Sequence, residues 1–367
     1  MNTQIQDKFT FKNGQTMRNR VVLAPMTICA SEPGGYVSQA DIDFFARRSR
    51  SVGMVITGST YVHPLGKSFA ESFSGAEDDK VEGLSRLAKA IKDQGALAIV
   101  QLYHGGRMVL PDLIDGQPVA PSAVKAPRDY LAEPRALKNA EVEQVIEDFL
   151  SAIRRAIQAG FDGVELHGAN TYLIQQFVSP HSNVRKDKWG GSLNNRLRFP
   201  KTLLKRAKQL VKEEADRPFL IGYRFSPEEI EEPGIQLYDT LQLLEQLIYH
   251  QVDYLHISTF DVWRSSIRDS QDSEPVIQKI IKKINDRVPL IGVGQIETKQ
   301  DAQRVLDAGV PLFALGKALL LDPDWTEKVV SGRESEVIRA YRDEMQADLA
   351  LPTAFVEDAR SYLEGKD

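Results

Sequence analysis

The sequence is poor in cysteine, in long apolar runs and in excess positive charge, and each shortage excludes a class of protein. Cys29 is the single cysteine among 367 residues, which excludes an intramolecular disulfide and a cysteine-rich zinc or iron–sulfur site. No run of about 20 apolar residues occurs, so we expect no transmembrane helix. The net charge of −5 argues against a protein that binds nucleic acid or an anionic membrane.

Several catalytic signatures are missing as well. The chain has no Ser/His/Asp signature, no His-Glu-x-x-His motif and no P-loop. Its six histidines are scattered, so we expect no metal site. The first eight residues are polar and lack the apolar core of a signal peptide, and together with the single cysteine this favours a cytoplasmic location.

What the sequence does contain is a regular alternation of short apolar runs and amphipathic stretches. The apolar runs predict strands at 21–25, 54–58, 98–103, 163–167, 219–225, 254–258, 290–293 and 312–315. The amphipathic stretches predict helices at 40–51, 81–94, 140–159, 197–214, 238–250, 274–286 and 299–308. Gly95 and Gly160 follow two of these helices, as expected for a residue that ends a helix.

This alternation is typical of α/β proteins, either a closed parallel barrel or a doubly wound open sheet. The first strand lacks the Gly-x-Gly-x-x-Gly turn of a dinucleotide-binding open sheet. Polar residues follow most strands, where barrel active sites lie. We therefore expect a single (β/α)8 TIM barrel at 1–350, followed by a C-terminal tail or helix at 351–367. An Asn13-Gly14 pair predicts a hairpin with a type I′ turn that caps the barrel bottom, and long loops are expected at 104–138 and 173–195, after strands three and four.

The end of the fourth strand carries the most candidate catalytic residues. His167, Asn170 and Tyr172 stand close together in the sequence there. His167 and Asn170 can both donate hydrogen bonds, so together they could polarise a carbonyl oxygen. Tyr172 carries a phenolic proton and is a candidate general acid. The alternative is that His167 and Asn170 only hold a loop in place while Tyr172 packs.

The last two strand ends predict a phosphate site. Gly294 and Gln295 follow strand seven, and Gly316 and Lys317 follow strand eight, the two loops that often bind phosphate in barrels. Glycines are also common in such turns for steric reasons alone. Within strand five, Arg224 requires either an anionic or electron-rich ligand, or a core carboxylate such as Glu165.

These residues resemble the Old Yellow Enzyme family of FMN-dependent NAD(P)H:flavin oxidoreductases and ene-reductases. The resemblance covers roughly residues 5–325. It is carried by NRVVLAPMT at 19–27, QLYHGGR at 101–107, GFDGVELHGANTYLIQQF at 160–177 and SPHSNVRKDKWGGSLNNRLRF at 179–199.

The resemblance implies FMN as cofactor, NADH or NADPH as reductant, and a small electrophile such as an activated alkene as substrate. His167 and Asn170 would hold the substrate oxygen while hydride passes from flavin N5, and Tyr172 would protonate the α-carbon. Pro25, Met26 and Thr27 would line the flavin ring, and Ser59 and Gln101 would contact its polar edge. Arg224 would stabilise the anionic reduced flavin. The phosphate would be held by Gly294, Gln295, Gly316 and Lys317. The cofactor-binding residues implied are Pro25, Met26, Thr27, Ser59, Gln101, Arg224, Gly294, Gln295, Gly316 and Lys317.

The sequence departs from the family at several positions. Some bacterial members have cysteine at the position of Thr27 and tyrosine at that of Cys29, so Cys29 is expected to pack near the rim of the site. Lys317 replaces a commoner arginine and loses a bidentate phosphate contact. The C-terminal tail does not match the arginine-bearing terminus of some members, so a homo-oligomer is possible but not specified.

Three other readings stay open at this point. The same FMN site could reduce a nitro compound, a quinone or free flavin. The barrel could be an aldolase that uses Lys317 as a Schiff base, or a flavin-binding protein without turnover.

Overall fold

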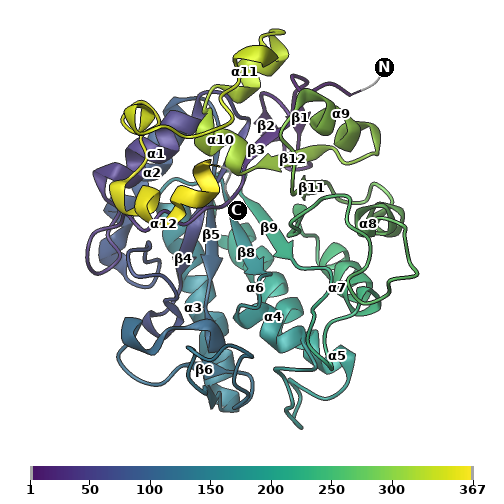
Figure 1. Cartoon of the computed structure of the whole chain (residues 1–367). Coiled ribbons are helices and arrows are strands. Elements are labelled where there is room, and N and C mark those ends of the chain that lie inside the picture. The colour runs from purple at the N-terminus through teal and green to yellow at the C-terminus, as the bar shows by residue number, and fades with distance from the viewer. Residues whose placement is uncertain (1–2, 365–367) are drawn as a thin grey trace.

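A computed structural model describes residues 3–364, and its centre is a closed barrel of eight parallel strands (Figure 1). The strands pair in the order β10-β11-β12-β3-β4-β5-β8-β9, and the last closes onto the first. They are β3 (Val21–Leu23), β4 (Met54–Tyr61), β5 (Leu97–Tyr103), β8 (Gly163–Gly168), β9 (Leu220–Phe225), β10 (Tyr254–Ile257), β11 (Leu290–Val293) and β12 (Leu312–Leu315). The predicted (β/α)8 barrel is confirmed, and the open sheet is excluded.

Helices surround the barrel, and the seven predicted from the amphipathic pattern are all present (Figure 1). They are α1 (Gln39–Ser49), α2 (Val81–Asp93), α3 (Asn139–Gln158), α6 (Arg198–Glu214), α7 (Leu237–Tyr249), α8 (Val276–Ile284) and α9 (Lys299–Asp307). Side-chain caps define some of the ends: the hydroxyl of Ser38 accepts a hydrogen bond from the backbone N–H of Asp41 in α1. Gly95 and Gly160 have φ of 85°, which confirms them as residues that end helices.

The N-terminal hairpin, formed by β1 (Phe9–Thr10) and β2 (Thr16–Met17), closes the bottom of the barrel as predicted. Phe11 and Met17 belong to the same buried cluster as the inward-facing apolar residues of the strands. The ring of Phe11 lies 6.2 Å from that of Tyr254. The predicted turn type is wrong, because a type I′ turn needs positive φ at both central residues and here only Gly14 has it.

The two long connections contain more structure than the sequence indicated. The first contains a short pair of strands, β6 (Val119–Ala120) and β7 (Arg135–Ala136). The second was expected to be a loop, but it begins with α4 (Leu173–Val178) and ends with α5 (Leu193–Arg196). All six residues of α4 are buried, so tertiary packing stabilises this helix although it is short.

The chain after β12 adds α10 (Lys317–Leu321), α11 (Trp325–Val330) and α12 (Thr353–Glu364). The expected C-terminal helix is α12, which packs against α10 on the side of the barrel shared with α1 and α2 (Figure 1). None of the helices in residues 3–364 is long and apolar enough to cross a membrane.

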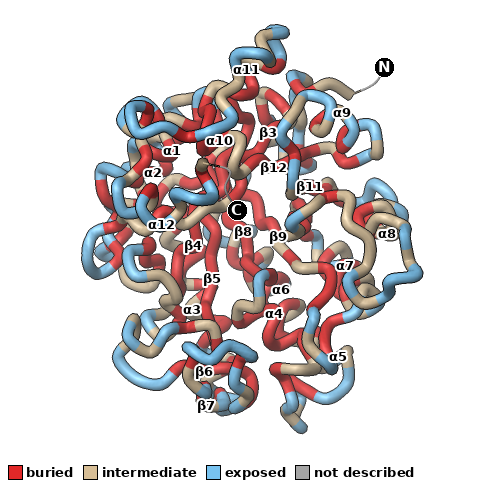
Figure 2. The backbone as a smooth tube through the Cα atoms, in the orientation of Figure 1, coloured by how far each residue is buried: buried red, intermediate tan, exposed pale blue. Residues whose placement is uncertain are grey.

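The barrel interior changes character from one end of the strands to the other. Near the hairpin it is apolar, with Val22, Ile56 and Ile99 among the buried residues of one cluster. Towards the carboxyl ends the inward-facing side chains become polar. Figure 2 shows the barrel strands as mostly buried, whereas the segments around them are a mixture of buried, intermediate and exposed residues. Because all eight strands are parallel, their carboxyl ends meet at one mouth of the barrel, where a site can form.

Candidate active site

His167 is the last residue but one of β8, and the structure determines which of its nitrogens carries the proton. The side chain is 2% exposed. Burial, together with the nearby charge of Arg224, lowers its pKa well below the usual value, so the imidazole is neutral. The backbone N–H of Ala169 donates to Nδ1 at 3.4 Å. The remaining proton is therefore on Nε2, which can donate a hydrogen bond to a ligand.

Asn170 is held in a left-handed backbone conformation, with φ of 55°. Its backbone N–H donates to the hydroxyl of Ser226 at 3.0 Å, and its side-chain oxygen accepts from the hydroxyl of Ser258 at 2.8 Å. Ser258 follows β10, so the asparagine is fixed from a second strand. With the oxygen occupied, the NH₂ group of the amide can donate to a ligand.

Thr171 also has a positive φ, of 65°, which is unusual for a β-branched residue. Two side chains from α4 hold this strained position. Gln175 accepts from the N–H of Thr171 at 3.1 Å, and Gln176 donates to its carbonyl at 2.6 Å. Such strain clusters at functional sites, where the surrounding structure enforces it. Here it directs the chain from Asn170 to Tyr172.

Tyr172 precedes α4, and its ring is packed edge-on against three other rings, those of His167, Tyr103 and Phe69. The ring centroids lie 4.9 Å from His167 and 5.2 Å from Tyr103. Burial raises the pKa of Tyr172 to about 12, so the phenol keeps its proton at neutral pH. The structure therefore places a protonated phenol beside a neutral imidazole, as a general acid beside a hydrogen-bond donor would be arranged.

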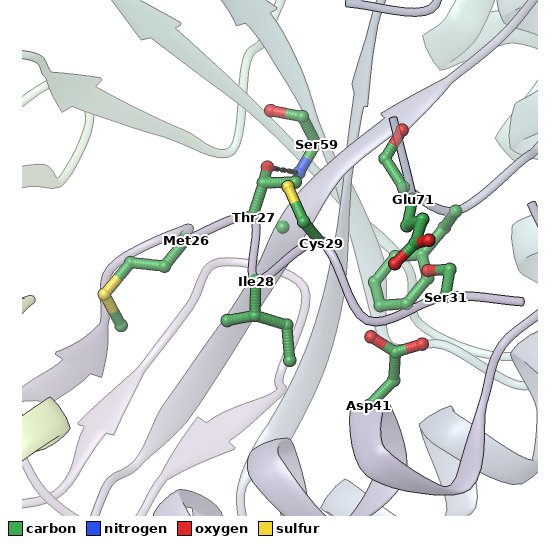
Figure 3. Close-up of a pocket in the computed structure, with 11 residues that line it drawn as sticks. Met26, Thr27, Ile28, Cys29, Ser31, Asp41, Ser59 and Glu71 are labelled. Atoms are coloured by element: carbon green, nitrogen blue, oxygen red, sulfur yellow. Dashed lines mark hydrogen bonds between the residues drawn. The ribbon is translucent and has the colours of Figure 1, made fainter. Parts of the chain in front are cut away.

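Four of the other predicted residues form a polar wall across β3, β4, β5 and β9. The hydroxyl of Thr27 accepts from the N–H of Ser59 at 3.1 Å (Figure 3), and the hydroxyl of Ser59 donates to Gln101 at 3.2 Å. Gln101 in turn donates to Glu165 at 2.8 Å. Arg224 makes no hydrogen bond to Glu165, and its Nε is buried without a hydrogen-bond partner among the described residues. The arginine therefore still requires an acceptor from a ligand.

Cys29 lines a small cavity with Met26, Thr27 and Ser59, which places it at the rim of the site as expected (Figure 3). Burial raises the pKa of its thiol, and the carboxylates of Asp358, Glu71 and Asp41 add to this rise. The thiol is therefore protonated and unreactive at neutral pH.

The four residues predicted to hold phosphate line one cavity of about 640 Å³. They are Gly294, Gln295, Gly316 and Lys317. Gly294 has φ of 120°, and a Cβ there would lie 2.6 Å from the carbonyl oxygen of Phe260, so only glycine fits. In residues 3–364, no carboxylate forms a salt bridge with Lys317. Backbone N–H groups at glycines, beside a lysine without a carboxylate partner, suit the binding of an anionic group.

Among the lining residues that sequence reasoning missed is Tyr362 on α12, far from the others in the sequence. Its ring lies 4.7 Å from Nζ of Lys317, a cation–π contact, and it lines the cavity. No motif in the tail indicates this position, because it depends on how α12 packs on α10.

The sequence profile of the NADH:flavin oxidoreductase / NADH oxidase family matches residues 7–336. The chain belongs to this family. A solved old yellow enzyme homologue from Zymomonas mobilis is 27% identical, with a TM-score of 0.78 over 90% of this chain and 93% of that one. The resemblance to the Old Yellow Enzyme family is confirmed. The family depends on FMN and uses NADH or NADPH, so the chain belongs to a family of FMN-dependent NADH/NADPH oxidoreductases.

Three similar proteins differ in how much of their own length this chain covers. A NADH:fumarate oxidoreductase of Klebsiella pneumoniae (strain 342) is 47% identical over 92% of this chain and 37% of its own length. A NADH:acrylate oxidoreductase of Vibrio harveyi is 43% identical over 96% of this chain and 36% of its own. The chain thus spans little more than a third of these two proteins. The probable NADH-dependent flavin oxidoreductase YqiG of Bacillus subtilis (strain 168) is 44% identical over 90% of this chain and 89% of its own length.

Proposed function

We propose that this family member reduces activated alkenes, such as enones, with electrons from NADH or NADPH. The observation that carries the proposal is the arrangement at the end of β8. A buried neutral His167, with its proton on Nε2, stands beside a protonated Tyr172, and Asn170 has an amide free to donate. An alkene conjugated to a carbonyl needs hydrogen bonds to its oxygen and a proton for its α-carbon.

The residues that would hold FMN fall into two groups. Gly294, Gln295, Gly316 and Lys317 would hold the phosphate in the cavity that they line. Pro25, Met26, Thr27, Ser59, Gln101 and Arg224 would line the ring system and its polar edge. The unpaired buried Nε of Arg224 supports this assignment, because an electron-rich ring edge offers the missing acceptor. When bound, FMN takes hydride from the nicotinamide and supplies it to the second substrate.

The protein's own contribution follows from the three residues at the end of β8. His167 and Asn170 would donate hydrogen bonds to the substrate oxygen, which withdraws electrons from the β-carbon. Tyr172 would give its phenolic proton to the α-carbon. The imidazole does not protonate near neutral pH, so it stays a single donor and does not compete with Tyr172 as an acid.

The names of two relatives support the alkene as substrate class. Fumarate and acrylate both contain a carbon–carbon double bond conjugated to a carboxyl group, so both are activated alkenes. Membership of an FMN-dependent family leaves the aldolase interpretation of Lys317 without support.

An anaerobic two-step experiment tests the proposal. Bleaching of the bound flavin near its visible maximum is followed after mixing with NADH and, separately, NADPH. The reduced protein is then mixed with cyclohexenone, acrylate, a nitroaromatic compound or free FMN. We expect rapid reoxidation by the alkenes with formation of the saturated product. Reoxidation by the nitro compound or flavin alone would refute alkene reduction and favour the alternative on the same site.

A second candidate is favoured by the lengths and names of the longer relatives. They share NADH as reductant, differ in acceptor, and both match this chain over more than 90% of its length. In this candidate, the shared part oxidises NADH and a separate protein or domain reduces the alkene. The same experiment separates the two, because this candidate predicts fast bleaching by NADH without reoxidation by any alkene.

A further inference from the structure

Inside the barrel mouth, Glu165 and Arg224 are oppositely charged but do not form a salt bridge. Glu165 is completely buried, and both of its carboxylate oxygens are occupied by other groups. Gln101 donates to Oε1 at 2.8 Å, and His256 Nδ1 lies 2.9 Å from Oε2. Both of these residues belong to strands adjacent to β8 or β9 in the barrel.

The protonation states of the buried pair can be assigned. Burial raises the pKa of Glu165, but the hydrogen bonds from His256 and Gln101 and the charge of Arg224 bring it below its usual value, so the carboxylate is charged. Burial dominates at His256 and lowers its pKa, so this imidazole is neutral. Nδ1 therefore donates to the carboxylate, and Nε2 is a buried acceptor with no partner among the described residues.

The carboxylate affects two of the residues that would contact FMN. By accepting from Nε2 of Gln101, it fixes the amide so that the Gln101 oxygen faces the hydroxyl of Ser59. It also lies close to Arg224, because Glu165 is opposite Gly222 in the pairing of β8 with β9, two residues before the arginine. Burial lowers the pKa of Arg224, and among the nearby groups the negative charge of Glu165 counteracts that shift most. The alkene chemistry uses neither Glu165 nor His256.

We propose that Glu165, held by His256, is a positioning residue that sets the reduction potential of bound FMN, by offsetting the charge of Arg224 and fixing the amide of Gln101. The inference rests on the proposed contacts of Arg224 and Gln101 with the cofactor. Reduced flavin carries negative charge, which a nearby guanidinium stabilises and a nearby carboxylate destabilises. The carboxylate therefore keeps the potential lower than Arg224 alone would.

The test is the equilibrium potential of the bound flavin, measured against a reference dye in the purified holoprotein, for wild type and Glu165→Gln. The substitution removes the charge but allows the hydrogen bonds to persist. The new amide can accept from Gln101 and donate to His256 Nδ1, provided that the imidazole proton moves to the unpartnered Nε2. We expect the reduced form to gain at least tenfold over the oxidised form, which is about 30 mV upward for a two-electron couple.

Asp253→Asn is the control, because Asp253 is another barrel carboxylate but stands before β10, at the opposite end of the barrel, where it accepts the backbone N–H of Ile221 and pairs with Lys208. It removes the same charge, and we expect less than a twofold change in the ratio of reduced to oxidised flavin. An unchanged potential in Glu165→Gln, or an equal shift in the control, would overturn the inference.

If Glu165→Gln folds but does not retain FMN, two substitutions at His256 test the inference instead. His256→Asn keeps an N–H at the position of Nδ1 and should keep the wild-type potential. His256→Leu removes the donor, favours protonation of Glu165 and should shift the potential upward. Equal potentials in these two variants would contradict the role of the pair. Wild type that binds no FMN or is not reduced by NADH would instead refute the proposed function itself.

Discussion

Replacing Tyr172 with phenylalanine removes one oxygen atom from a ring that the structure holds against His167 and Tyr103. Both ring contacts are made by carbon atoms that phenylalanine retains. The hydroxyl makes no hydrogen bond to any group in residues 3–364, so we expect the free energy of unfolding to change by less than about 1 kcal/mol. The substitution therefore separates the chemical role of the phenol from its packing.

The expected effect on catalysis is much larger than the effect on stability. A positioned general acid contributes about 10²–10⁴ in rate, equivalent to about 3–5 kcal/mol in the barrier. That factor should be lost only from the step in which the alkene takes hydride and a proton. Reduction of the flavin by NADH or NADPH needs no proton from Tyr172, so its rate should change less than about threefold.

Stopped-flow measurement of the two half-reactions checks this prediction, and the pH dependence adds a second criterion. Because burial raises the pKa of Tyr172 from 10.0 to about 12, the phenol should stay protonated, and the alkene step should stay constant, from neutral pH to the ordinary tyrosine value. Stability gained from the neutral phenol is present below pH 10 and is lost as the pH rises through the folded-state value. An equal loss in both half-reactions would show that Tyr172 is not the proton donor.

Three further substitutions test other parts of the molecule. Asn170→Ala should slow alkene reduction by about 10²–10³ and weaken binding of a phenol, while FMN content stays unchanged; unchanged phenol affinity, measured by absorbance titration, would refute its role. Gly294→Ala should lower FMN affinity at least tenfold in a fluorescence titration, because its Cβ would lie 2.6 Å from a carbonyl oxygen; wild-type affinity would refute the cavity as the phosphate site. Phe11→Ala should cost about 3–5 kcal/mol in chemical denaturation while leaving the flavin spectrum unchanged, because the hairpin is at the opposite end of the barrel.

The barrel could be predicted from the sequence because each strand is a short apolar run that is buried on both faces. That pattern depends only on local composition, and the strand predictions agree with the structure at all eight positions. The type I′ turn at Asn13-Gly14 failed because the dipeptide is compatible with more than one turn, and the choice depends on how the hairpin meets the barrel. The helix α4 was missed because all six of its residues are buried, Gln175 and Gln176 included, so it lacks the amphipathic period of a surface helix.

The candidate site was predictable where its residues occupy strand ends. Parallel strands bring their carboxyl ends together whatever the loop sequences are, so Thr27, Gln101 and Lys317 could be assigned to one mouth before the structure was known. The hydrogen-bond partners could not be assigned in this way. Arg224 and Glu165 were one possible ion pair in the sequence, but in the barrel the carboxylate is occupied by Gln101 and His256.

The reason for that difference is register. His256 is opposite Arg224 in the pairing of β9 with β10, and Glu165 is opposite Gln101 in the pairing of β5 with β8. Which side chains reach the carboxylate depends on the register between adjacent strands. The sequence of one strand alone does not give that register. The outcome leaves the Nε of Arg224 buried and without a hydrogen-bond partner among the described residues. A hydrogen bond from this atom to Glu165 would have satisfied it within the protein, so the register that brings Gln101 and His256 to the carboxylate leaves Nε available for a ligand.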